Sequence, residues 1–148
     1  MQAATIRAAV RDAATGSSPW DPIPAERLAA IGRRCGEAEI AEVIAVLDEL
    51  SAEREALPDW DGDSSDDIAK AQSSYASILG HVPGPRLPAV VVGLASASAD
   101  TRRWLTLALE AHGAAALPAL RGARDAERDP ATRQFMTAAV GRLEAATA

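Results

Sequence analysis

The acidic segment 58–67 is the part of the sequence whose residue types come closest to a chemical site. Aspartates alternate there at Asp59, Asp61 and Asp63, and carboxylates at this spacing supply oxygen ligands to Ca²⁺. A calcium loop of the EF-hand kind, however, has glycine at position six and glutamate at position twelve. Counted from Asp59, glycine stands at position four and Lys70 at position twelve, where it adds a positive charge. The pattern favours a solvated, helix-capping loop or a protein-contact loop, and no metal is expected.

Trp60 stands between two of these aspartates, and a tryptophan in a loop has two common positions. It packs back over the ends of its own helices, or it is offered to a partner, because a large aromatic side chain contributes strongly to an interface. The first position is the more common. Trp20, in the proline-flanked segment 19–22, presents the same choice. The candidate partner-binding residues are Trp60, Asp59, Asp61, Asp63 and Trp20.

Catalytic chemistry finds little support elsewhere in the chain. His81 and His112 fall at expected helix ends, where an imidazole interacts favourably with the helix dipole, and no cysteine or carboxylate lies beside both at ligand spacing. Cys35 follows two arginines, which lower a thiol pKa, but no histidine lies near it in sequence. We expect it to be a buried cysteine at a helix end. Nucleophile-elbow, phosphate-loop and zinc motifs are absent from the sequence, so no catalytic residue and no cofactor are expected.

The charge is divided unevenly along the chain, whose formal net charge is −6. Residues 1–80 carry 7 basic and 15 acidic side chains, whereas residues 81–148 carry 8 basic and 6 acidic ones. An acidic surface disfavours nucleic acid, whose phosphates require a basic face. The acidic front half instead suggests a protein partner with a basic patch.

The elements that position these residues are predicted to be helices throughout, because apolar residues recur with a period near 3.6 and no alternating stretch is found. Hydrophobic residues make up 48% of the chain and aromatic residues only 3%, which also argues against a β fold. The expected helices cover residues 2–14, 24–35 and 37–56, then a fourth that ends at 80, and 87–97, 99–112, 115–127 and 130–146. The fourth helix is expected to begin directly after its cap, which is Ser64 or Ser65. The longest apolar run, 87–97, is too short to cross a bilayer. The N-terminus lacks the apolar core of a signal peptide, so a cytoplasmic protein is expected.

An internal repeat in the second half indicates how these helices are organised. Leu87-Pro88-Ala89-Val90 returns as Leu117-Pro118-Ala119-Leu120, and Thr101-Arg102-Arg103-Trp104-Leu105 returns as Thr132-Arg133-Gln134-Phe135-Met136. Each unit reads as a helix, a short turn with Asp100 or Asp129, and a second helix. Such pairs gain a core only by stacking on neighbours.

These units resemble HEAT repeats and the related short bacterial repeats of the phycobilin-lyase type. The resemblance covers residues 85–146 directly and 39–80 loosely. It implies a small right-handed α-solenoid of about four helical hairpins, and a plain helical bundle is the alternative. It also implies that Arg102 and Arg133 tie neighbouring repeats through turn carboxylates. The expected domain is single: a cap at 1–36, a loose repeat at 37–82 that carries the acidic loop 58–67, and repeats at 83–113 and 114–148.

The function expected from these features is a non-catalytic, protein-binding scaffold or regulatory module. It would use a face of the helix stack together with the acidic tryptophan loop. The alternative is a HEAT-like enzyme or nucleic-acid-binding protein with its site in the concave groove, suggested by the arginines of the second half. The sequence leaves open the identity of the partner, the oligomeric state, the biological pathway, whether the groove holds a small ligand and whether the acidic loop binds calcium.

Overall fold

The computed structural model describes residues 6–16, 18 and 21–147. All regular structure in these residues is helical and none of it is strand, which confirms the all-α prediction. The α-helices are α1 (Ile6–Ala13), α2 (Ala25–Arg34), α3 (Glu37–Glu55), α4 (Gly62–Gly80), α5 (Leu87–Val92), α6 (Ala99–Glu110), α7 (Leu117–Ala126) and α8 (Pro130–Thr147). Three short 3-10 helices flank α5 and α7: η2 (Gly84–Arg86), η3 (Gly93–Ala95) and η4 (Gly113–Ala116).

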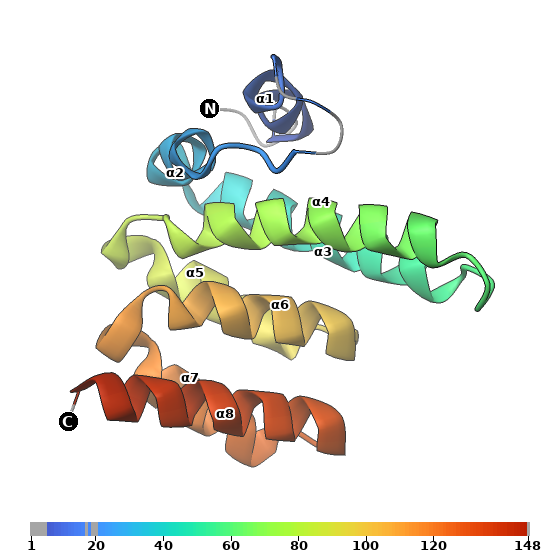
Figure 1. The fold of residues 1–148 in the computed structure, drawn as a ribbon. Helices are drawn as coiled ribbons and strands as arrows, with labels where there is room; N and C mark the ends of the chain where they lie inside the picture. The colour runs from blue at the N-terminus through green and yellow to red at the C-terminus, as the bar shows by residue number, and fades with distance from the viewer. Residues whose placement is uncertain (1–5, 17, 19–20, 148) are drawn as a thin grey trace.

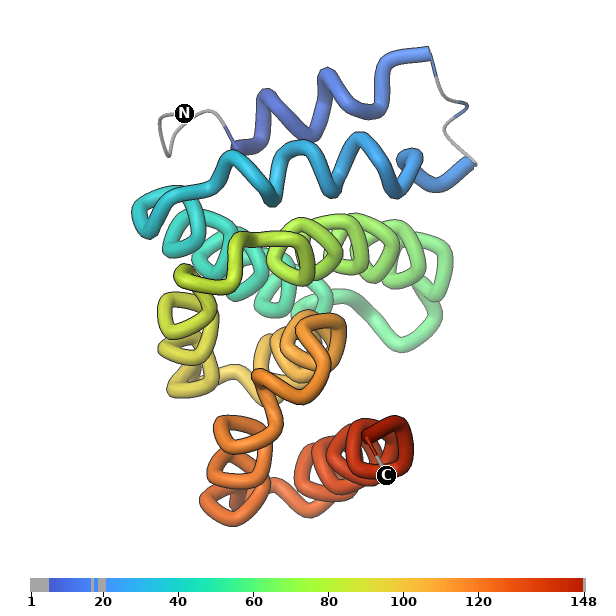
Figure 2. Tube along the Cα trace, turned by 90° about the vertical axis from the view of Figure 1, so that its left-hand side faces the viewer, coloured from blue at the N-terminus to red at the C-terminus, as the bar shows by residue number. Residues whose placement is uncertain are grey.

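From α3 onward the helices form three hairpins, α3–α4, α5–α6 and α7–α8, which lie one above the other (Figure 1). Figure 2 shows α3, α5 and α7 along one side of the stack and α4, α6 and α8 along the other. Helix α6 packs against both α4 and α8, so the second helices of the hairpins form a layer. Helices α1 and α2 lie at the N-terminal end, and α2 packs on α4.

One hydrophobic core extends from α1 to α8. Leucine, isoleucine and valine fill most of it, as the scarcity of aromatic residues predicts. The largest fully buried apolar side chains are Ile6, Ile40, Leu47, Ile78, Leu79, Leu105, Leu109, Leu120, Met136, Val43 and Val46. Gln72 is also fully buried, and it is the polar member of this set.

Each second helix of a hairpin begins at a side-chain cap, which satisfies an amide that the helix itself leaves unpaired. The cap accepts from the amide three residues on in all three cases: Asp61 from Ser64 (3.2 Å), Ser98 from Thr101 (3.2 Å) and Asp129 from Thr132 (2.9 Å). The prediction that Ser64 or Ser65 caps α4 is wrong. The helix starts earlier, because the Asp61 carboxylate caps it and Gly62 already lies in its first turn.

The predicted helix at 87–97 is shorter in the structure. Helix α5 ends at Val92 and its last turn tightens into η3, as often happens at helix ends. Gly93, at that junction, packs against α3 and α6. A Cβ on it would lie 2.6 Å from Cδ1 of Leu105 and 2.9 Å from Cδ1 of Ile44. The absence of a side chain at Gly93 therefore allows the close approach of three helices.

Glycine has a similar role where α2 meets α4. A Cβ on Gly32 would collide with the carbonyl oxygen of Ile78 and would lie 2.9 Å from Cβ of His81. Helix α2 packs on α4 through this contact, and α1 additionally contacts α3.

Within the described residues no single helix is both long and apolar enough to cross a membrane. The segments Gly62–Gly80 and Gly84–Ala95 meet the length and hydropathy requirement only when joined, across a bend of 113°.

Candidate partner-binding site

The acidic segment predicted as a loop at 58–67 is a turn only as far as Asp61, because residues 62–67 form the first turns of α4. The turn connects α3 to α4. Helix α3 ends at Glu55, a turn follows in which the amide of Asp61 donates to the carbonyl oxygen of Pro58 (3.0 Å), and α4 begins at Gly62. The turn is therefore short and closed by backbone and cap hydrogen bonds. It holds Trp60 at its tip.

Trp60 does not pack back over the helix ends. Its side chain is 83% exposed, more than any other large hydrophobic residue that the structure describes. The physical reason lies in its position immediately before the cap. An apolar residue there usually packs against the residue four positions after the cap, which in this helix is Ser65. Ser65 offers no apolar surface and instead accepts a hydrogen bond from Nε of Arg54 (3.0 Å).

The aspartates of the loop divide into two kinds. Asp61 is partly buried because its carboxylate caps α4. Asp59 and Asp63 are exposed beside Trp60, and Asp66 and Asp67 are exposed on the first turns of α4. The structure thus brings four of the five predicted binding residues together in one turn. The fifth, Trp20, lies outside the described residues.

Metal binding finds no geometric support in this loop. Among the described residues no three histidine, cysteine, aspartate or glutamate side chains are grouped so that they could hold a metal ion. Asp61 already uses its carboxylate as the helix cap.

The remaining reactive side chains have structural partners. Nδ1 of His81 lies 2.8 Å from the carbonyl oxygen of Ser77, and Nε2 of His112 lies 2.9 Å from that of Leu79, which links the ends of α6 and α4. The thiol of Cys35 donates to the carbonyl oxygen of Ile31 (3.3 Å). Burial, with a smaller contribution from Glu39, raises the pKa of Cys35 to about 11, so this buried thiol lacks the thiolate character of a nucleophile.

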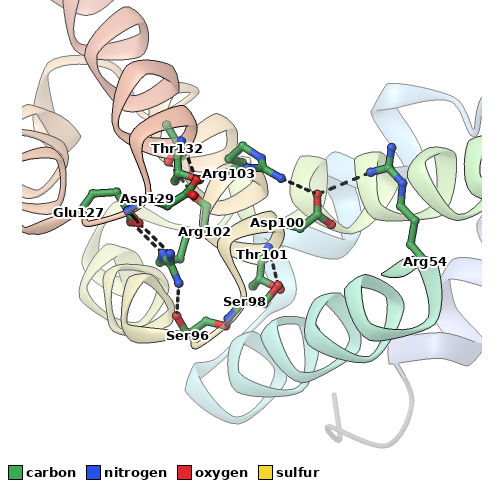
Figure 3. Close-up of polar contacts among 11 residues, drawn as sticks. Arg54, Ser96, Ser98, Asp100, Thr101, Arg102, Arg103, Glu127, Asp129 and Thr132 are labelled. Carbon is green, nitrogen blue, oxygen red and sulfur yellow. Dashed lines mark hydrogen bonds and ion pairs between the residues drawn. The ribbon is translucent and has the colours of Figure 1, made fainter. Parts of the chain in front are cut away.

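A buried polar cluster joins the first two hairpins. One carboxylate oxygen of Asp100 accepts from the side chains of Ser51 and Gln72 (both 2.8 Å). Its other oxygen faces Arg54 at 3.5 Å and Arg103 at 3.6 Å (Figure 3). Burial alone would raise the pKa of Asp100, but the hydrogen bonds from Gln72 and Ser51, followed by the two arginines, outweigh it and lower the pKa below its ordinary value.

The cluster continues into the third hairpin through two arginines. Arg103 donates to Oγ1 of Thr132 (3.0 Å) beside Asp129. Arg102 makes a bidentate pair with Glu127 (2.7 and 2.8 Å) and donates to the carbonyl oxygen of Ser96 (2.8 Å) (Figure 3). Arg102 thus contacts a carboxylate in the turn of the next hairpin. Arg133 contacts the carbonyl oxygen of Asp125 (3.4 Å) and no carboxylate among the described residues. Both Arg102 and Arg103 are engaged within the protein, which leaves them poorly placed to contact phosphates.

A surface groove between α3 and α5 was not predicted. It has a volume of about 630 Å³ and its lining is mostly apolar: Ala41, Ile44, Pro88, Ala89, Val92, Gly93 and Ala95, with Glu37, Asp48 and Ser96 at its margins. One feature of the sequence indicates this groove. The run 87–97 is almost uniformly apolar, yet Val90 and Gly93 alone are fully buried within it. A short helix that is apolar all round leaves apolar side chains at the surface.

Comparison with known proteins adds no family to this description: no protein-family model, no curated protein and no solved structure matches the chain.

Proposed function

We propose that this protein is a short HEAT-like repeat module that binds another protein through the Trp60 loop, which we define as the turn 58–61 together with the first turns of α4, residues 62–67. The repeat organisation is supported by the equivalent caps of α4, α6 and α8. Seven residues after each cap stands a buried apolar side chain: Ile68, Leu105 and Met136. A stack of hairpins built in this way presents its turns and helix faces to solvent as binding surface.

The proposal rests on one observation: Trp60 is exposed at a position where folding does not require a tryptophan. The residue immediately before the cap is Trp60 in the first hairpin, Ala97 in the second and Arg128 in the third. The other two hairpins form with a small and a charged residue there, so folding does not require an indole. Exposing the apolar surface of a tryptophan to water is unfavourable. Tryptophan is also enriched among the residues that contribute most of the binding energy at interfaces.

The carboxylates around Trp60 specify the kind of partner. Asp59, Asp63, Asp66 and Asp67 are all exposed and lie within seven residues of Trp60 along the chain. This arrangement fits a partner with an apolar pocket surrounded by lysine or arginine. Since such charge pairs lie at the rim of an interface, they accelerate association and weaken as salt increases.

Affinity capture from the source organism tests the proposal. The wild-type chain and Trp60→Ala would be used as baits, with Arg128→Ala as a control that changes the equivalent position of another turn. The partner retained by the wild type would be purified and titrated against all three. We expect Trp60→Ala to weaken binding by at least about 30-fold, the effect of losing an interface residue worth about 2 kcal/mol. Binding to Arg128→Ala should be unchanged.

The charged rim is tested with the same purified partner. Replacing Asp59 and Asp63 by asparagine keeps their size and removes two charges. We expect slower association and a weaker dependence on salt, with dissociation little affected. Undiminished binding by Trp60→Ala would contradict the proposal, whatever the aspartate variants do.

A further inference from the structure

The groove between α3 and α5 lies outside the Trp60 loop and has no role in the proposal above. Its volume of about 630 Å³ is within the range of pockets that bind small ligands. Its apolar wall is formed by α5, where the Val92 side chain is 72% exposed, and by Ile44 of α3, which is half-buried. An exposed valine beside an apolar hollow is an unfavourable surface for a protein to leave in water.

The fold itself keeps the groove open. Helix α5 has only 6 residues and is less than a third the length of α3, which has 19, so it covers only part of its neighbour. Ala89, on the α5 side, and Ala41, on the α3 side, contribute only methyl groups to the lining. The hollow is thus a consequence of the short α5 and of the small side chains beside it.

Acidic groups mark the margins of the groove along α3. Glu37 and Asp48 both line it. They are eleven residues apart, which is three helical turns or about 16 Å. Asp48 accepts from the hydroxyl of Ser96 (2.7 Å), a neutral donor that leaves the carboxylate its charge. Glu37 is 77% exposed and faces Arg86 at 3.7 Å. An ion pair so open to water contributes little and yields readily to a competing cation.

From this arrangement we propose that the groove receives an amphipathic helix of a partner protein. Apolar residues of that helix, spaced by three or four positions, would fill the hollow over Val92 and Ile44, the mode in which helices bind grooves. Lysine or arginine side chains on both sides of the apolar residues would pair with Glu37 and Asp48. The inference stands independently of the Trp60 loop, because it uses none of the residues of that loop.

A displayed library of helical peptides tests the groove without knowledge of the natural partner. The folded chain would be the target, and enriched peptides would be synthesised and titrated. We expect enriched sequences with an apolar stripe and a basic residue at each end, separated by about three turns. Val92→Glu should weaken their binding at least tenfold, and Glu37→Lys should weaken it and reduce its salt dependence. Trp60→Ala should bind them as the wild type does.

Other occupants give different results. Enriched peptides without flanking basic residues, or peptides whose binding is unaffected by Val92→Glu, would overturn the inference, and so would a failure to enrich any peptide. A second copy of this chain in the groove would appear in sedimentation as a dimer that Val92→Glu dissociates, and this too would overturn it. Val92 and Glu37 are both exposed, so these variants should fold, and an unchanged melting temperature would verify it.

Discussion

Replacing Asp100 by alanine is expected to lower the free energy of unfolding by about 3 kcal/mol. The carboxylate accepts hydrogen bonds from Ser51 and Gln72 and faces Arg54 and Arg103. Its removal leaves one side-chain N–H of Gln72 without an acceptor, whereas Ser51 keeps its hydrogen bonds to Thr101 and Gln72. Ser51 and Gln72 are both almost completely buried. The cost of an unpaired buried polar group exceeds the value of the hydrogen bond itself, so one substitution disturbs the contact between two hairpins.

Chemical denaturation at neutral pH measures this loss. Asp125→Ala is the matched control, because Asp125 is exposed and, among the described residues, its carboxylate pairs only with its neighbour Arg124. We expect it to change stability by less than about 0.5 kcal/mol. Equal stabilities of Asp100→Ala and Asp125→Ala would show that the cluster does not join the hairpins.

The pH dependence of the same pair of proteins provides a second comparison. Because the pKa of Asp100 is lowered in the folded state, its contribution is fully present above the ordinary carboxyl pKa of 3.8 and is lost as pH falls through the folded value. The wild type should therefore lose more stability than Asp100→Ala between about pH 5 and pH 2. If the stabilities of the wild type and Asp100→Ala fell in parallel over this range, Asp100 would not have the lowered pKa described above.

Replacing Gly32 by alanine is expected to destabilise the protein by about 1–3 kcal/mol, although alanine is the better helix former. The added methyl group would collide with the carbonyl oxygen of Ile78. Backbone cannot move aside as a flexible side chain does, so α2 would have to shift away from α4. We expect a lower melting temperature and faster hydrogen exchange in α1 and α2.

Gly122→Ala is the control for this prediction. Gly122 lies inside α7 and a Cβ there meets nothing within 4 Å. Alanine should stabilise that helix by about 0.5–1 kcal/mol, since it removes only the conformational freedom of glycine in the unfolded chain. If both substitutions stabilised the protein, α2 would not pack on α4 as described.

Helices and turns could be predicted from the sequence because their signals are local. Each of these signals acts within a few residues. They are the periodic spacing of apolar residues, Pro88 and Pro118 near helix starts, and glycines near helix ends. The start of α4 was placed too late because three polar residues, Asp61, Ser64 and Ser65, could each act as its cap. Local chemistry does not decide among them.

Features that depend on distant residues could not be predicted. Gln72 stands eleven residues after its cap, where the other hairpins have the buried Leu109 and Val140. A glutamine is accommodated there because Asp100 and Ser51 arrive from other helices. Its Oε1 atom is buried and has no hydrogen-bond partner in the part of the chain that the structure describes. No local pattern indicates such a cluster.

The Trp60 loop was predicted as a candidate site, but not the exposure of its tryptophan. Whether Trp60 packs back depends on what α4 offers four residues after its cap, and Ser65 offers nothing apolar. The groove between α3 and α5 was missed for a related reason. It depends on how much of α3 the short helix α5 covers, a property of packing rather than of local sequence.

Site-specific photo-crosslinking in the source organism tests the central claim most directly. A photoreactive phenylalanine analogue would replace Trp60 in one variant and Arg128, the equivalent residue of the third hairpin, in another. We predict one dominant crosslinked protein from position 60 and no such product from position 128. The adduct should map to an apolar pocket bordered by lysine or arginine. The same products from both positions, or none from position 60, would contradict the assignment of Trp60 as the binding residue.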